Sequence, residues 1–166
     1  MKISLEKAKQ DRLFYVVTNG IIYHPKLKKC LILQRSFKEI AHPGLWGVVG
    51  GKMEWSELKT NPPTRQNFDI SDWEGLLEQS LFREAKEESG LVVIDPRYLF
   101  SIVYLRPDNI PVVLLKFAVK YKKGKVSIPK DFEDFAWVDA KEVKKYKCIQ
   151  GIDKEVEKTI RVYSTP

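Results

Sequence analysis

Short apolar runs recur along most of the chain, and they predict strands. Residues 13–24 (LFYVVTNGIIYH) form one run, interrupted by Asn19 and Gly20, and residues 30–35 (CLILQR) follow a turn that contains Pro25. Apolar runs bounded by turn residues are typical of strands, so these two segments are expected to be neighbours in a sheet. Four further strand-like runs lie between residues 91 and 128: LVVI, LFSIVYLR, VVLLKFAVKY and KVSI.

A helix is predicted between these two groups of strands. Residues 71–74 (SDWE) have the form of a capping box, in which a serine and a glutamate satisfy backbone N–H groups of the first turn. Leu77, Leu81 and Ala85 then recur at steps of four, which predicts an inward-facing stripe. Gly90 is the residue type that ends helices in a left-handed conformation. The helix is therefore expected to run from about residue 72 to residue 89.

The end of the chain predicts a strand and a second helix. FAWVDAKEVKKY passes from a strand pattern to a helical one, and KEVEKTIRVY has a long helical pattern. Strands on both sides of one helix, with another helix at the end, indicate an α/β domain whose mixed sheet is covered on both faces. A length of 166 residues suits one domain, so residues 1–166 are expected to form a single unit.

Composition narrows the class of protein. Hydrophobic residues make up 43% and charged residues 31% of the chain, as in ordinary soluble domains, and no run approaches the roughly 18 apolar residues of a membrane span. The first residues are too polar for a signal peptide, so a cytoplasmic location without membrane contact is expected. Cys30 and Cys148 belong to no metal-binding pattern, and inert thiols are expected.

Positive charge is concentrated in the last third of the chain. The formal net charge is +7, and ten lysines lie between Lys116 and Lys147. A basic surface attracts nucleic acid, but it also steers small polyphosphates, and lysines at a solvated sheet edge need no partner. No aromatic-interleaved or helix-turn-helix pattern accompanies these lysines. Nucleic acid therefore receives little support from the composition.

An acidic cluster stands out against this positive background. Residues 83–90 read REAKEESG, and Glu84, Glu87 and Glu88 fall on one side of the predicted helix. Like charges at this spacing repel one another, and a single arginine, Arg83, does not neutralise three carboxylates. A hard divalent cation that binds oxygen ligands would neutralise the three carboxylates, and Mg²⁺ suits a site with few protein ligands. A solvated helix face is the structural alternative.

The glycine-rich stretch before this helix completes a recognisable pattern. Gly51-Lys-Met-Glu-Trp-Ser-Glu57, followed by Arg83-Glu-Ala-Lys-Glu-Glu-Ser-Gly-Leu91, resembles the signature G-x5-E-x7-R-E-U-x-E-E-x-G-U of the Nudix hydrolases, the MutT-like family. The resemblance extends through CLILQRS, LWGVVGG and FAWVDAKEV, and so covers residues 13–162. It implies an α/β/α sandwich with a mixed central sheet. It also implies Mg²⁺-dependent hydrolysis of a nucleoside diphosphate linked to another moiety, with Mn²⁺ as the alternative metal.

One departure from the family pattern concerns its spacing. Between Glu57 and Arg83 lie 25 residues where the pattern has 7, so 18 residues are inserted, within a loop at about residues 58–72. The insertion leaves open whether Glu57 keeps its usual place or whether Glu54 or Glu78 substitutes for it. Because Pro62 and Pro63 lie in this loop, we expect a flap or wall beside the substrate.

The resemblance implies a set of catalytic and metal-binding residues. The expected metal ligands are the backbone carbonyl of Gly51 and the carboxylates of Glu84, Glu87 and Glu88. Arg83 is expected to orient these carboxylates. A general base is expected just before the FAW strand, at Glu133 or Asp134, with Glu133 preferred.

Substrate recognition is less defined. Arg35 and Lys52 are expected to meet phosphates and Trp46 to stack on a base, although a tryptophan in such a run is more often part of the core. A nucleotide-type small molecule is the expected substrate, without a further identification. The alternatives are an RNA-cap hydrolase and an inactive domain that binds a nucleotide or RNA, and a homodimer is left open.

Overall fold

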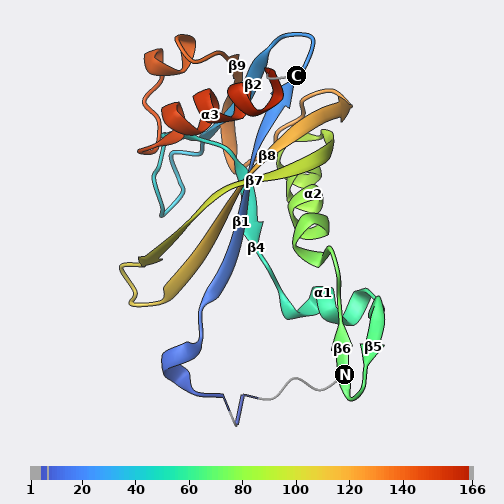
Figure 1. Cartoon of the computed structure of the whole chain (residues 1–166). Helices are drawn as coiled ribbons and strands as arrows, with labels where there is room; N and C mark the ends of the chain where they lie inside the picture. The colour runs from blue at the N-terminus through green and yellow to red at the C-terminus, as the bar shows by residue number, and fades with distance from the viewer. Residues whose placement is uncertain (1–4, 7, 165–166) are drawn as a thin grey trace.

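A computed structural model describes residues 5, 6 and 8–164 as one mixed sheet between two helices (Figure 1). In this part of the chain, no helix is long and apolar enough to cross a membrane. The strands of the main sheet are β1 (Tyr15–His24), β2 (Lys29–Arg35), β3 (Trp46–Gly47), β4 (Val49–Lys52), β7 (Val92–Leu105), β8 (Pro111–Lys123) and β9 (Phe132–Val138). The helices are α1 (Trp55–Thr60), α2 (Leu76–Ser89) and α3 (Ile152–Ser164), with short 3₁₀ turns η1 (Gln10–Arg12) and η2 (Glu142–Lys145).

The order of the strands confirms the predicted mixed sheet. The path is β3-β2-β1-β8-β7, with β4 paired to β1 and β9 paired to β2. The β1–β8 pair is parallel, and the other pairs of this sheet are antiparallel. As predicted, β1 and β2 are neighbours. The glycine-rich β4 therefore lies beside β1, where α2 crosses the sheet.

Two apolar clusters hold one helix on each face of the sheet, which is the predicted α/β/α arrangement. On one face Leu81 and Ala85 of α2 pack among buried strand residues such as Ile22. On the other face Val156 of α3 packs against a second set, which includes Ile21. Gly20 belongs to the α2 face, and a Cβ there would lie 3.0 Å from Leu81 Cδ1. The absence of a side chain at this position lets the helix approach β1 closely.

The start of α2 differs from the prediction. The capping box proposed for residues 71–74 is wrong, because Ser71 and Asp72 belong to a strand and the helix begins at Leu76, after Gly75 in a left-handed conformation. The buried stripe accordingly contains Leu76, whereas Leu77 is only half-buried. The predicted end is confirmed, since Gly90 adopts φ 74° and donates its N–H to Lys86.

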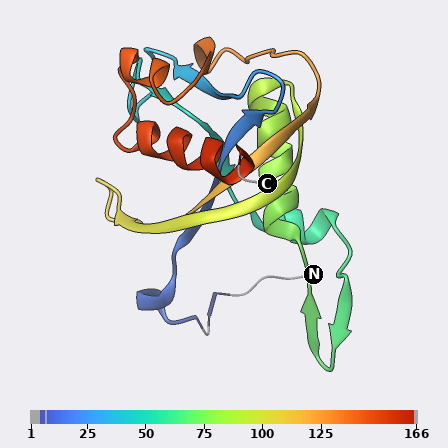
Figure 2. The ribbon, with the colours of Figure 1, turned by 45° about the horizontal axis from the view of Figure 1, so that its top comes forward.

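The inserted segment is not the predicted loop. Its first residues continue α1, which begins with its own capping box between Glu54 and Glu57. A small antiparallel hairpin follows, made of β5 (Arg65–Asn67) and β6 (Ile70–Asp72), and it projects beyond the N-terminal end of α2 (Figure 2). Trp73 ties the base of the hairpin to α1 by donating its indole N–H to the carbonyl of Asn61 at 2.8 Å.

Four other expectations need correction. The run LVVI and the run LFSIVYLR belong to one strand, β7, which passes Pro96 through an irregularity in its pairing with β8. Asn19 and Gly20 do not interrupt β1, and KVSI (125–128) is not a strand. Lys116 does not contribute to a basic surface, since it is buried on β8 and paired with Glu155 of α3.

Candidate functional site

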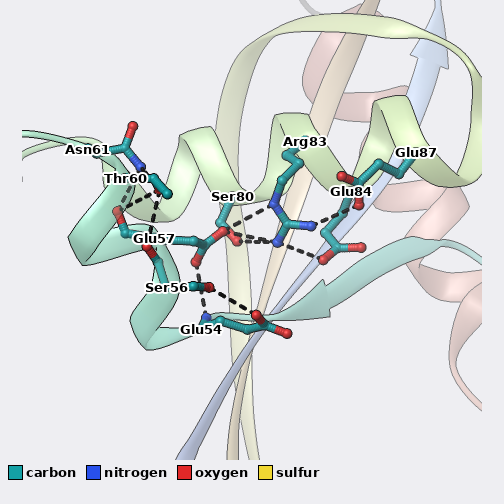
Figure 3. Close-up of polar contacts among 9 residues, drawn as sticks. All are labelled: Glu54, Ser56, Glu57, Thr60, Asn61, Ser80, Arg83, Glu84 and Glu87. Atoms are coloured by element: carbon teal, nitrogen blue, oxygen red, sulfur yellow. Dashed lines mark hydrogen bonds and ion pairs between the residues drawn. The ribbon is translucent and has the colours of Figure 1, made fainter.

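Arg83 on α2 is shared by three carboxylates (Figure 3). Its Nε and Nη2 atoms donate to Glu57 Oε1 at 3.2 and 3.0 Å. Nη2 also lies 2.9 Å from Glu84 Oε1, and Nη1 lies 2.8 Å from Glu87 Oε2. Burial opposes the charge on Arg83, but the bonds to Glu57 and the charges of the other glutamates raise its pKa. The guanidinium is therefore held in its charged form at the centre of an acidic cluster.

Glu57 reaches this cluster from α1, across the inserted segment. Its other carboxylate oxygen accepts the backbone N–H of Glu54 at 3.1 Å, so both oxygens are occupied and the side chain is buried. Burial alone would raise the pKa of Glu57, but the Glu54 N–H, the Ser80 hydroxyl and Arg83 lower it. In the structure it is Glu57, rather than Glu54 or Glu78, that pairs with Arg83. Its contacts fit a residue that positions the arginine.

Glu88 lies on the same helix but is held differently. Its Oε2 atom accepts the backbone N–H of Gly50 at 2.8 Å. Burial raises the pKa of Glu88 to about 8, although the Gly50 N–H opposes this rise. Among the charges that act on Glu88 are those of Arg35, which lowers its pKa, and Asp131, which raises it. The cost of charging Glu88 is thus only partly offset by its surroundings.

Gly51 leaves room for Glu84. A Cβ at Gly51 would overlap the carboxylate of Glu84, so any other residue would displace this side chain. Burial raises the pKa of Glu84, and Arg83 moderates the shift. The backbone of β4 and the acidic face of α2 are therefore in direct contact. This contact explains why a glycine is needed at the end of the GVVGG run.

The chemistry of these donors fits a hard divalent cation. Carboxylate oxygens at Glu84, Glu87 and Glu88, next to the backbone of Gly51, are the ligand type that Mg²⁺ prefers. In residues 5, 6 and 8–164, however, no group of three or more acidic, histidine or cysteine side chains is gathered at metal-binding distances. The reason is visible in the contacts, since Arg83 attracts Glu84 and Glu87 while the Gly50 N–H holds Glu88. Glu87 is 56% exposed and has room to turn.

The proposed base, Glu133, lies outside this cluster. One oxygen of Glu133 accepts the Ser36 hydroxyl at 2.6 Å and the Phe37 N–H at 3.3 Å, and these bonds lower its pKa. Asp134 accepts the N–H of Phe135, its own neighbour. Sequence reasoning did not single out Asp131, although it is the acid of this segment whose charge acts on Glu88. The position of Asp131 just before β9, beside the two proposed bases, was the sequence signal that could have identified it.

The three residues proposed to bind substrate lie in different settings. Arg35, at the end of β2, donates to the carbonyl of Ala41 and pairs with Glu39 at 2.6 Å. Trp46 is buried, with its ring 4.7 Å from that of Tyr146, which matches the core alternative for this residue. Lys52 is exposed at the end of β4. Their roles toward a substrate stay predictions.

Comparisons with known proteins identify the family and the fold of this chain. The family model described as NUDIX domain matches residues 14–159. The MutT protein from Methanosarcina mazei Go1 is 19% identical, with 95% of this chain and 100% of that chain covered and a TM-score of 0.63. The NUDIX domain of Shewanella oneidensis NrtR, crystallised with ADP ribose, is 17% identical over 97% of this chain and 96% of that chain, with a TM-score of 0.66.

A third solved structure has the same fold. The E. coli ORF135 protein is 21% identical, with 95% of this chain and 97% of that chain covered and a TM-score of 0.63. The search of curated proteins gave no match. At these levels of identity the solved structures establish the fold, and the match of the family model covers the whole acidic cluster with both segments that build it.

Proposed function

Because the chain belongs to the NUDIX family of hydrolases, we propose that it hydrolyses a phosphoanhydride in a nucleoside diphosphate linked to another moiety, with Mg²⁺ or Mn²⁺. The observation that carries this proposal is the excess of acid around Arg83. One guanidinium faces Glu57, Glu84 and Glu87, while Glu88 is half-buried nearby with a raised pKa. Such an excess is unfavourable for stability alone and favourable for binding a cation.

Four groups are proposed to hold the metal: the carbonyl of Gly51 and the carboxylates of Glu84, Glu87 and Glu88. A bound divalent cation activates water and neutralises charge on phosphate oxygens. To become ligands, Glu84 and Glu87 must exchange Arg83 for the cation. The two bonds that Arg83 donates to Glu57 would hold its positive charge in place beside the ligands. Glu57 and Arg83 are thus proposed to position the ligands.

The proposal for the base includes two acidic side chains near the start of β9. Glu133 is the first candidate, and its bond to Ser36 fixes the carboxylate in one orientation. The same bond lowers the pKa of Glu133, which weakens it as a base. Asp134 is the second candidate. Replacing the true base by its amide should lower kcat by roughly 100-fold to 10,000-fold with little change in KM.

For the substrate, we propose that Arg35 and Lys52 attract phosphate groups. Arg35 is close enough to influence Glu88, and Lys52 extends from the strand that contains Gly51. The fold of the chain resembles that of a domain crystallised with ADP ribose. ADP-ribose is therefore the first substrate to test, ahead of nucleoside triphosphates, dinucleotides and other nucleotide sugars.

A hydrolysis screen tests the proposal. Each substrate is incubated with Mg²⁺, with Mn²⁺ and with EDTA, and phosphate-containing products are identified by mass. We expect metal-dependent turnover of at least one nucleoside diphosphate derivative, and loss of that turnover in Glu88→Gln. Equal, background rates over the whole panel with and without metal would favour a domain that binds nucleotides without hydrolysing them.

The basic last third of the chain favours one second candidate, an RNA-cap hydrolase. Nine of the ten lysines between positions 116 and 147 remain after the buried Lys116 is set aside. Phosphate contacts with RNA make binding fall steeply with salt concentration. Including a capped RNA in the screen, at two salt concentrations, separates this candidate from hydrolysis of a free nucleotide.

A further inference from the structure

The outer half of β7 is an exposed sheet edge without the features that usually protect one. The sheet path ends at β7, which pairs with β8 among the described residues. From Ser101 to Leu105 every residue is exposed, with Val103 at 66% and Leu105 at 62%. The segment reads SIVYL and contains no charged residue. A regular edge of this kind offers free backbone N–H and C=O groups to another strand.

The inner half of the same strand provides a contrast. There the pairing with β8 is irregular between Val92 and Val93, between Ile94 and Arg97, and between Tyr98 and Phe100. Asp95 forms ion pairs with Arg97 and Lys120. Bulges and charges of this kind discourage pairing with another chain. The outer half, by comparison, pairs regularly with β8 from Ser101–Leu115 to Leu105–Pro111.

A second strand of the sheet shows that this chain protects edges elsewhere. β9 pairs with β2 in the described residues and contains two acidic residues, Glu133 and Asp134. In Figure 1 the tip of the β7–β8 hairpin points away from both α2 and α3, and residues 101–105 are all exposed. Residues 101–105 thus form an uncharged, exposed edge that pairs regularly with β8 on its other side.

We propose that residues 101–105 of β7 pair antiparallel with the same residues of a second copy, so that the sheets of two chains join into one. With Val103 on the two-fold axis, Val103 meets itself, Ile102 meets Tyr104 and Ser101 meets Leu105 of the other copy. Apolar side chains are thereby paired on both faces, and no charges are buried. An isologous contact of this type closes at two copies.

The expected dimer is weak. Pairing of five residues, with the adjoining exposed side chains of Ile102 and Tyr104, buries less than the roughly 800 Å² per partner of a standard interface. The dimer should therefore dissociate on dilution, with a dissociation constant of the order of micromolar or above. The site of α2 lies on another part of the molecule, so dimerisation and hydrolysis can be tested separately.

Sedimentation velocity over a range of protein concentrations tests the pairing. We expect the mass to rise from that of a 19.3 kDa monomer to that of a dimer. Val103→Lys and Val103→Glu should each remain monomeric at least tenfold higher in concentration, because like charges meet on the axis. Mixing these two variants should restore a dimer. Ile94→Lys, in the charged inner half of the same strand, is the matched control and should dimerise like wild type.

A cysteine at the axis gives an independent test. Opposed residues of an antiparallel pair have Cα atoms about 4.5–5.5 Å apart, which is compatible with a disulfide. Val103→Cys should form a covalent dimer under mild oxidation, and Ile94→Cys should not. A wild-type protein that stays monomeric at the highest concentration would overturn the proposal. So would assemblies larger than a dimer, or equal dimerisation of wild type and both charged Val103 variants.

Discussion

Two groups of charged side chains lie against opposite faces of the same sheet, and they differ in charge balance. On the α3 face, Lys116 and Glu155 form a buried pair, with Nζ to Oε1 at 3.0 Å and side chains that are 6% and 4% exposed. On the α2 face, one arginine, Arg83, faces three carboxylates, and Glu88 adds a fourth nearby. The first group is balanced one to one. The second carries a clear excess of negative charge.

The difference separates a structural role from a functional one. A balanced buried pair stabilises little, but the loss of either partner leaves an uncompensated charge and is strongly destabilising. An unbalanced cluster is unfavourable for the folded state until a cation binds. Burial adds to this cost, since it raises the pKa of Glu84 and Glu88, and neighbouring glutamates raise both further. Loss of one partner of the balanced pair should therefore lower stability and leave turnover unchanged, whereas loss of a carboxylate from the unbalanced cluster should abolish turnover and, without metal, should not lower stability. The predictions that follow test this division.

The largest expected effect concerns turnover by the unbalanced cluster. Replacing Glu84, Glu87 or Glu88 by glutamine removes a proposed metal ligand at almost constant volume. Each change should lower kcat/KM about 1,000-fold or more, because lost metal charge weakens both water activation and phosphate neutralisation. Steady-state rates on the best substrate from the screen measure this effect. Glu157→Gln, an exposed change on α3, is the matched control.

Retained activity in these variants would contradict the division of roles. If Glu88→Gln kept its activity and responded to Mg²⁺ as wild type does, the acidic face would be a solvated surface after all. The excess of carboxylates would then need another explanation. Loss of activity in the Glu157→Gln control would point instead to a general loss of folded protein.

The second effect concerns stability and belongs to the balanced pair. Lys116→Met leaves Glu155 buried without a partner, and the free energy of unfolding should fall by about 3–5 kcal/mol. The double change Lys116→Met with Glu155→Leu should recover most of this loss, because neither charge is then buried. Denaturant unfolding measures both variants. The rate per folded molecule should stay within about twofold of wild type, since this pair does not contact the acidic cluster.

Sequence reasoning found the acidic cluster because its signal is local. Glu84, Glu87 and Glu88 share one helix, so their spacing alone places them on one side. The fold class was also predictable, since apolar runs and the resemblance to a known family agree. The pairing of Arg83 with Glu57 was not predictable, because Glu57 lies 26 positions earlier and an inserted segment separates the two residues.

The errors have two physical causes, which are competition between local signals and contacts between distant positions. The residues SDWE have the form of a helix start, but Asp72 accepts the backbone N–H of Thr64 and closes a hairpin instead. Glu54 and Glu57, which begin a helix, were not recognised as a capping box. The sequence around Lys116 gives no sign that it is buried, because its partner, Glu155, lies 39 positions away. Long-range contacts of this kind are not encoded in a local pattern.

A third prediction compares stability at different pH values without metal. The pKa of Glu88 is about 8 in the folded protein and 4.5 in a solvated chain, so the folded state binds more protons between these values. Stability contributed by neutral Glu88 is therefore fully present below pH 4.5 and is lost as the pH rises through about 8. Glu88→Gln does not titrate. Its stability relative to wild type should increase by roughly 2–4 kcal/mol between pH 4.5 and 9.

Unfolding in EDTA at several pH values measures this difference. Saturating Mg²⁺ should oppose it, since a ligand that binds only the folded state adds about 2.7 kcal/mol at a hundredfold excess over Kd. The advantage of Glu88→Gln should therefore shrink when metal and substrate are present, and it should reverse where the ligand contribution exceeds the cost of charging Glu88. A difference that stays constant from pH 4.5 to 9 would mean that Glu88 is charged at no cost, and the contrast with the balanced pair would disappear.

The smallest expected effect concerns the inserted hairpin, which is connected to the unbalanced cluster through α1. Trp73 bonds to Asn61, Asn61 caps α1 at the carbonyl of Glu57, and Glu57 holds Arg83. Replacing residues 64–72 by Asn-Gly removes the hairpin and keeps Trp73 and Asn61. If the hairpin forms a wall beside the substrate, KM should change several-fold, on the order of 1 kcal/mol or less, while metal binding persists. Arg65→Met is the control, because the exposed Arg65–Asp72 pair contributes little to stability.

Two titrations distinguish the possible roles of the hairpin. Substrate titrations at saturating Mg²⁺ measure KM, and metal titrations of the same variants measure binding at the proposed metal site. An unchanged KM and unchanged preference among substrates would make the hairpin a bystander. A loss of metal binding would instead show that the hairpin keeps Glu57, and through it Arg83, in place.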